Sequence, residues 1–209
     1  LEISEKFDKF YFELENYKEA FNCLQYAVSF DDAQSEGWLG YFYYYGIGTD
    51  NDLVKSYEYF QKASDKNLGY GSWYLGLIHS HGIKEIGLKI NLEKSFDYYK
   101  KSYEENYASA RESLAQIYYY GVGTEKNYLE SYKLLSKFND SLSAFGKELL
   151  AKHYLLGRGT DQDINKGVAL LEKNVEGGDI ASTQALNILF GINYLDKENR
   201  NVQSTFFYQ

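Results

Sequence analysis

The chain has 209 residues, of which 44% are hydrophobic and 25% charged, so it can bury a sizeable core as a soluble protein. Its net charge of −8 excludes a basic nucleic-acid-binding surface, disfavours anionic membranes and favours a basic protein partner. Its apolar runs are far shorter than the ~20 residues that a membrane-spanning helix needs, so we expect no direct membrane insertion.

The chain begins with the residues LEIS and contains neither methionine nor proline. We therefore expect a processed or excised chain, and its compartment stays open between the cytoplasm, the periplasm and the exterior. The single cysteine, Cys23, can form no internal disulfide, and we interpret it as a small buried residue. Without proline, the helices must end by other means, such as glycine or asparagine in a left-handed conformation.

A first helix pair is predicted in residues 1–34. The stretch NYKEAFNCLQYAV, which begins at Asn16, has the spacing of an amphipathic helix and starts with a good N-cap residue. Its partner helix is expected near residues 3–13, joined to it by a short loop.

Residues 35–181 then repeat one unit of two blocks four times. The first block has a leucine, then a small residue, and a glycine seven positions after the leucine. These pairs are Leu39 and Gly46, Leu75 and Gly82, Leu114 and Gly121, and Leu150 and Gly157, so the glycines are 36, 39 and 36 residues apart. The second block reads DLVKSYEYFQKA from Asp52, NLEKSFDYYKKS from Asn91, NYLESYKLLSKF from Asn127 and DINKGVALLEKN from Asp163.

Both blocks have helical spacing, so each unit predicts a first helix, a tight turn, a second helix and another turn. The units are 35–70, 71–109, 110–145 and 146–181, and residues 83–90 carry a three-residue insertion. Asp or Asn begins each second helix as an N-cap, and the small residue after the leucine allows close packing. Asn67, Asn106 and Gly178 are expected to turn the chain into the next unit, where Leu142 stands at the equivalent position. Residues 182–209 form a last, shortened repeat that caps the array, with Asn193 in the glycine position.

The blocks L-G-x-x-Y-x-x-G-x-G and K-S/A-x-x-Y-F/Y-x-K-A resemble Sel-one-like repeats, which are relatives of tetratricopeptide repeats. The resemblance covers residues 35–191, while residues 1–34 are more similar to a plain tetratricopeptide motif. It implies an all-α, right-handed α-solenoid of about six antiparallel helix pairs. The first helices would line the concave side of such a solenoid and the second helices the convex side.

By this geometry, and by resemblance to tetratricopeptide arrays, five positions around each repeat leucine face a partner-binding groove. They hold Tyr41, Tyr44, Tyr45, Tyr70, Trp73, Leu77, Ser80, His81, Glu112, Gln116, Tyr119, Tyr120, Phe145, Glu148, Lys152, Leu155 and Leu156. Tyrosine and tryptophan on one surface suit protein binding, because they bury much area at low entropic cost. The alternative interpretation is that several of these rings pack against the neighbouring first helix.

No chemistry-bearing motif is complete. The stretches GIGTDND, GVGTEKN and GRGTDQD lack the lysine of a phosphate loop, the third glycine of a dinucleotide fingerprint and the glutamate of a calcium loop. We interpret them as joints between helices. His79 and His81 are two positions apart, so on a helix they point about 200° apart and cannot share a metal ion. We expect His79 to pack in place of a tyrosine, and we expect no catalytic residue, cofactor or metal site.

The leading functional hypothesis is a non-catalytic module, favoured as a monomer, that binds a protein or peptide through the groove. Resemblance to the family implies an adaptor of this kind. Two alternatives also come from the resemblance: a bacterial immunity protein that neutralises a secreted toxin such as a lipase, and a hydrolase. A structural spacer within a longer polypeptide is a further possibility.

Overall fold

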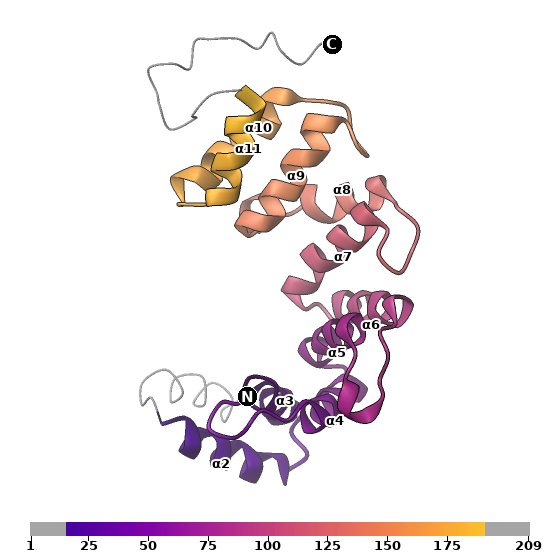
Figure 1. Cartoon of the computed structure of the whole chain (residues 1–209), viewed down its shortest axis with the longest axis vertical. Coiled ribbons are helices and arrows are strands. Elements are labelled where there is room, and N and C mark those ends of the chain that lie inside the picture. The colour runs from indigo at the N-terminus through magenta and orange to yellow at the C-terminus, as the bar shows by residue number, and fades with distance from the viewer. Residues whose placement is uncertain (1–15, 191–209) are drawn as a thin grey trace. The chain divides into compact units, whose positions relative to one another are not determined.

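The computed structural model describes residues 16–190. In this part of the chain there are ten α-helices, two short 3-10 helices and no strand other than one isolated bridge between Ile83 and Leu88 (Figure 1). The α-helices are α2 (Tyr17–Val28), α3 (Ala33–Tyr45), α4 (Leu53–Asp65), α5 (Gly69–His81), α6 (Leu92–Glu104), α7 (Ala108–Tyr120), α8 (Tyr128–Ser136), α9 (Ala144–Leu156), α10 (Ile164–Glu176) and α11 (Ile180–Phe190). The expected helix near residues 3–13, the turn at Asn193 and most of the last repeat lie outside the described residues.

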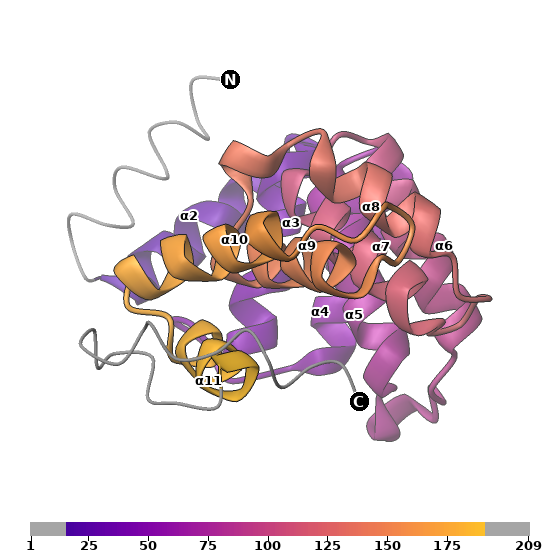
Figure 2. The ribbon, with the colours of Figure 1, turned by 90° about the horizontal axis from the view of Figure 1, so that it is seen from above.

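The helices fall into two compact units. The first unit contains α2 to α6, α7 as far as Ile117, and residues 121–125. The second contains residues 118–120 and continues from residue 126 through α11. Within each unit, successive helices pack on one another: α2 to α6 in turn in the first, where α3 also contacts α5, and α8 to α11 in the second (Figures 1 and 2). None of the described helices is both long and apolar enough to cross a bilayer.

The predicted N-caps are confirmed at every described second helix. In each case the side-chain oxygen of Asp or Asn accepts from the backbone N–H three residues later, which satisfies one of the free donors of the first turn. The capping residues are Asn16, Asp52, Asn91, Asn127 and Asp163.

The glycine-rich stretches are joints, as predicted. Gly46, Gly121 and Gly157 each end a first helix in the left-handed conformation. The second glycine allows close contact between backbones: a Cβ atom on Gly123 would lie 1.9 Å from the carbonyl oxygen of Leu92, at the start of α6. Gly82 departs from the pattern, with ψ 171°, because the insertion follows it and forms the 3-10 helix η1 (Lys84–Ile86).

Small residues on the first helices receive large side chains from the second helices. The ring of Phe60 on α4 lies against Gly40 on α3, where an added Cβ would come within 2.7 Å of it. The hydroxyl of Ser56 donates to the carbonyl oxygen of Gly40 at 2.8 Å, so the glycine also exposes a backbone acceptor. The sequence prediction of close packing after the repeat leucine is therefore confirmed.

The turns between repeats differ in one place. Asn67, Asn106 and Gly178 have positive φ angles, as expected for residues that turn the chain. Leu142 has a φ of −71°, because the 3-10 helix η2 (Asn139–Ser141) makes the turn instead. The prediction for Cys23 is wrong: its side chain is exposed, because the buried face of α2 is formed by other positions.

Candidate functional site

An aromatic surface joins the first helices α3 and α5. We define it as Tyr41, Tyr44, Tyr45, Tyr70 and Trp73, all of which belong to the predicted groove. Ring centroids of Tyr41 and Tyr70 are 6.4 Å apart, and those of Tyr41 and Tyr45 are 4.7 Å apart. Trp73 donates through Nε1 to the hydroxyl of Ser113 on α7 at 3.0 Å, which fixes the indole. Aromatic pairs of this kind stabilise by about 0.5–1.5 kcal/mol beyond their buried area.

The interpretation that several of these rings pack against a neighbouring first helix is confirmed for four of them. Tyr41, Tyr44, Tyr70 and Trp73 are half-buried because they pack against one another and against buried Tyr74. Their exposed edges remain accessible. Tyr45 is 53% exposed and stands at the end of α3. Sequence reasoning missed Tyr74 and Trp38, which occupy the position just before the repeat leucine.

Burial keeps the inner hydroxyls of this surface neutral. It raises the pKa of Tyr70 and of Tyr74 well above that of an exposed phenol, and neighbouring tyrosines raise both further. The surface therefore presents aromatic edges and uncharged hydroxyl groups.

A pocket of about 250 Å³ opens beside the aromatic surface. It lies between the start of α3, the start of α5 and the turn before α7. Its lining includes Gln34, Trp38, Tyr70, Glu105, Asn106 and Tyr107. Only Tyr70 of these was predicted as a groove residue; Trp38 lies within α3 beside the repeat leucine, and the others come from helix ends or the turn before α7.

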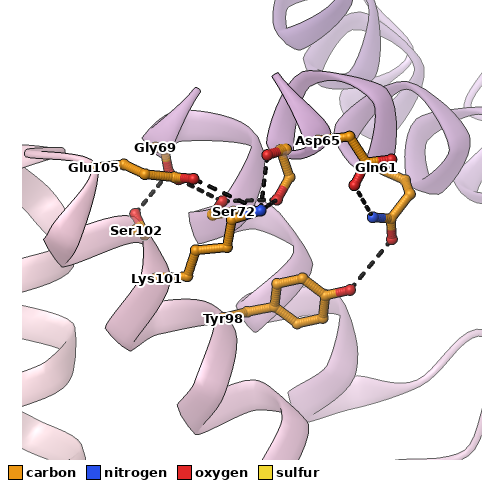
Figure 3. Close-up of polar contacts among 9 residues, drawn as sticks. Gln61, Asp65, Gly69, Ser72, Tyr98, Lys101, Ser102 and Glu105 are labelled. Carbon is orange, nitrogen blue, oxygen red and sulfur yellow. Dashed lines mark hydrogen bonds and ion pairs between the residues drawn. The ribbon is translucent and has the colours of Figure 1, made fainter. Parts of the chain in front are cut away.

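A buried chain of hydrogen bonds lies next to this pocket (Figure 3). Lys101 Nζ donates to the hydroxyl of Ser64 at 2.9 Å, and the hydroxyls of Ser64 and Ser72 are 2.8 Å apart. Ser72 donates in turn to Glu105 Oε2 at 2.6 Å. A serine beside a lysine can serve hydrolysis, but both serines are fully buried and fully partnered. The chain therefore ties α4, α5 and α6 together.

Other predicted groove residues of the first unit are more scattered. Leu77 is half-buried and packs on the core below the aromatic surface, together with Tyr44 and Trp73. His81 is exposed, and its Nδ1 lies 2.9 Å from the carbonyl oxygen of Leu77. On α7, Glu112 is half-buried and Gln116 exposed, while Ser80 on α5 is half-buried.

The remaining predicted residues belong to the second unit. Tyr119 is only 3% exposed, so the expectation that it faces a groove is not met. Arg158 covers it: Nη1 donates to the Tyr119 hydroxyl at 2.8 Å, and the guanidinium lies 5.4 Å from the ring centroid. Glu148 and Lys152 form an ion pair at 2.8 Å. Leu155 is half-buried, and exposed side chains are those of Tyr120, Phe145 and Leu156.

The histidines do not form a metal centre. His79 is 2% exposed and stacks on Tyr98 at 5.2 Å, which confirms its packing role. His153 is also buried, and its Nε2 lies 2.9 Å from the Ser131 hydroxyl. Burial lowers the pKa of both imidazoles. Among residues 16–190, no group of three or more His, Cys, Asp or Glu side chains is placed to hold a metal ion.

Comparisons with known proteins identify the repeat and the fold. A family model described as the Sel1 repeat matches residues 33–68, 70–107, 108–140 and 147–179. A Sel1-like repeat-containing protein of Schizosaccharomyces pombe is 34% identical over 67 residues, which are 32% of this chain. This chain matches 10% of that relative's length.

Two solved structures share the fold. A Sel1 repeat protein from Oxalobacter formigenes is 21% identical with a TM-score of 0.76, covering 95% of this chain and 80% of that one. A protective antigen of uropathogenic Escherichia coli strains, which displays an SLR fold, is 22% identical with a TM-score of 0.71, covering 83% and 37%. These likenesses confirm the all-α solenoid class. Since the repeat model matches well over half of the residues, the chain belongs to the Sel1 repeat family.

Proposed function

We propose that this chain is a non-catalytic interaction module that binds a protein or peptide partner through the aromatic surface of α3 and α5. Proteins of the Sel1 repeat fold commonly take part in protein–protein interaction. The observation that carries the proposal is that the half-exposed rings are already held in place by one another. A partner would bury rings that are already rigid, so binding would cost little conformational entropy at these side chains. This property is typical of binding hot spots.

The charge of the chain supports the same proposal. A net charge of −8 steers basic partners towards the molecule and repels acidic ones. The immunity-protein alternative is compatible with the same surface. It differs from the leading proposal only in the identity of the partner, which would be a secreted toxin. No contact among the described residues favours the hydrolase alternative, because the Ser64–Lys101 contact and the Ser131–His153 contact both involve a fully buried serine.

Partner capture with matched tyrosine variants tests the proposal. Tyr45→Ala removes an exposed ring from the aromatic surface, and Tyr26→Ala removes one that is 70% exposed on the second helix α2. Protein immobilised through a tag is incubated with native lysate, and retained proteins are quantified by mass spectrometry. We expect Tyr45→Ala to weaken capture of a specific protein by about tenfold or more, the scale of a hot-spot residue. Equal capture by wild type and Tyr45→Ala, with loss in Tyr26→Ala, would place the interaction elsewhere.

A further inference from the structure

The pocket beside the aromatic surface is lined by three rings in a row. The centroids of Trp38 and Tyr70 are 5.9 Å apart, and those of Tyr70 and Tyr107 are 5.7 Å apart. These rings come from α3, α5 and the turn before α7, so two successive repeats contribute to one pocket. Aromatic faces attract cations through their quadrupoles, and arginine is the cation found there most often.

A buried carboxylate closes one side of the pocket. The side chain of Glu105 is 9% exposed; its Oε2 accepts from Ser72, but its buried Oε1 has no hydrogen-bond donor. Lys101 Nζ forms an ion pair with that oxygen at 3.6 Å and donates its hydrogen bonds to the carbonyl and hydroxyl oxygens of Ser64. Figure 3 shows Lys101, Ser72 and Glu105 converging at this point. The carboxylate therefore places negative charge beside the rings, part of which Lys101 offsets, and this charge attracts a cation that enters the pocket.

We propose that this pocket binds an arginine side chain of the partner. The inference rests on the proposed function and names the residue by which the partner is anchored. A guanidinium group is planar, stacks on aromatic faces, loses little hydration and carries several donors. Glu105 supplies negative charge beside the rings, and the amide side chains of Gln34 and Asn106 in the pocket lining offer acceptors.

The charges around the pocket decide between a cation and an anion. The positive end of α5 would favour an anion, but Glu105 lies beside that first turn and its carboxylate would repel one. Lys101 offsets part of this charge through its ion pair with Glu105, and its Nζ also donates to Ser64. Stacking on the rings and the carboxylate of Glu105 together favour arginine over an acidic residue.

The two tryptophans of the chain make the pocket directly observable. Trp73→Phe leaves Trp38, on the pocket wall, as the only tryptophan and so the only source of indole fluorescence. Short capped peptides with a central arginine, citrulline, lysine or glutamate are titrated into this variant. Citrulline has the shape of arginine without its charge. We expect a saturable change with arginine, and binding about tenfold weaker or more with citrulline.

Two glutamine variants test the carboxylate in the same background. Glu105→Gln keeps the side-chain shape and an acceptor for Ser72, and should weaken arginine binding about tenfold or more. Glu104→Gln makes the same charge change at an exposed neighbour, and should change binding little. Circular dichroism confirms that each variant keeps its helices. Equal binding of arginine and citrulline, tighter binding of glutamate, or no effect of Glu105→Gln overturns the proposal.

Partner capture separates this inference from the proposed function. If Tyr45→Ala reduces capture and Glu105→Gln does not, the arginine anchor is wrong and the aromatic surface still binds the partner. If neither variant reduces capture, the proposed function fails. If both reduce it, and a partner peptide loses binding when its arginine is replaced by citrulline, both stand.

Discussion

Alanine at Gly123 is expected to destabilise the protein more than alanine at Gly87. Both glycines have left-handed backbones, with φ of +72° and +66°. A Cβ atom at Gly87 would meet nothing within 4 Å, whereas one at Gly123 would lie 1.9 Å from the carbonyl oxygen of Leu92. The pair therefore separates the conformational cost of a left-handed residue from the cost of steric overlap.

The magnitudes follow from these two terms. Left-handed strain costs about 1–2 kcal/mol for an alanine, and this term is common to both variants. At Gly123 the backbone must also move away from Leu92, and forced shifts in a packed site add about 1–3 kcal/mol. Gly123→Ala should therefore lower the free energy of unfolding by about 1–3 kcal/mol more than Gly87→Ala.

Urea unfolding followed by circular dichroism measures the difference. With a slope of about 2 kcal/mol per molar urea, the Gly123→Ala midpoint should lie about 0.5–1.5 M below that of Gly87→Ala. Because repeat arrays can unfold in segments, hydrogen exchange at the amides of α6 and α7 shows where the loss occurs. Equal midpoints, or a lower midpoint for Gly87→Ala, would refute the view that the second glycine serves close backbone contact.

Three further changes test the packing and the caps. Phe60→Ala removes a fully buried ring and should cost about 3–5 kcal/mol in urea unfolding, whereas Phe30→Ala, at a 63% exposed position, should cost under about 0.5 kcal/mol. The backbone N–H of Lys55 lowers the pKa of Asp52, so its stabilisation is present above the unfolded value of 3.8 and lost as pH falls through the lower folded value. Asp52→Asn keeps the cap and should flatten that acid loss in thermal melts. Burial lowers the pKa of His153, so stability should fall as pH drops below the unfolded value of 6.5, and His153→Gln should reduce that slope.

Local signals in the sequence predicted the helix ends correctly. An Asp or Asn side chain caps the helix that follows it, and a glycine ends the helix before it; both effects depend on only a few neighbouring residues. Asp52 can therefore be recognised as a helix cap, and Gly46 as a helix end, without knowledge of the fold. The repeat period extends these local predictions to every unit. It also predicts which residues near each repeat leucine are buried with it in the core.

The candidate site depended on contacts that the period does not specify. Tyr119 occupies a groove position of the repeat, but Arg158, from the next unit of the repeat, covers it. The pocket requires Trp38 of one repeat to meet Glu105 and Tyr107 of the next, and each differs from its counterparts in the other units. Such residues do not follow the repeat pattern, so an alignment of the units gives no reason to assign them to a site.

Site-specific photo-crosslinking tests the central claim most directly, because it reports which surface touches the partner. A benzophenone amino acid replaces Tyr45 on the aromatic surface or Tyr26 on α2, and each protein is irradiated with the captured partner. We predict a crosslinked adduct from position 45 and none from position 26. An adduct from position 26 with none from position 45 would contradict binding through the first helices.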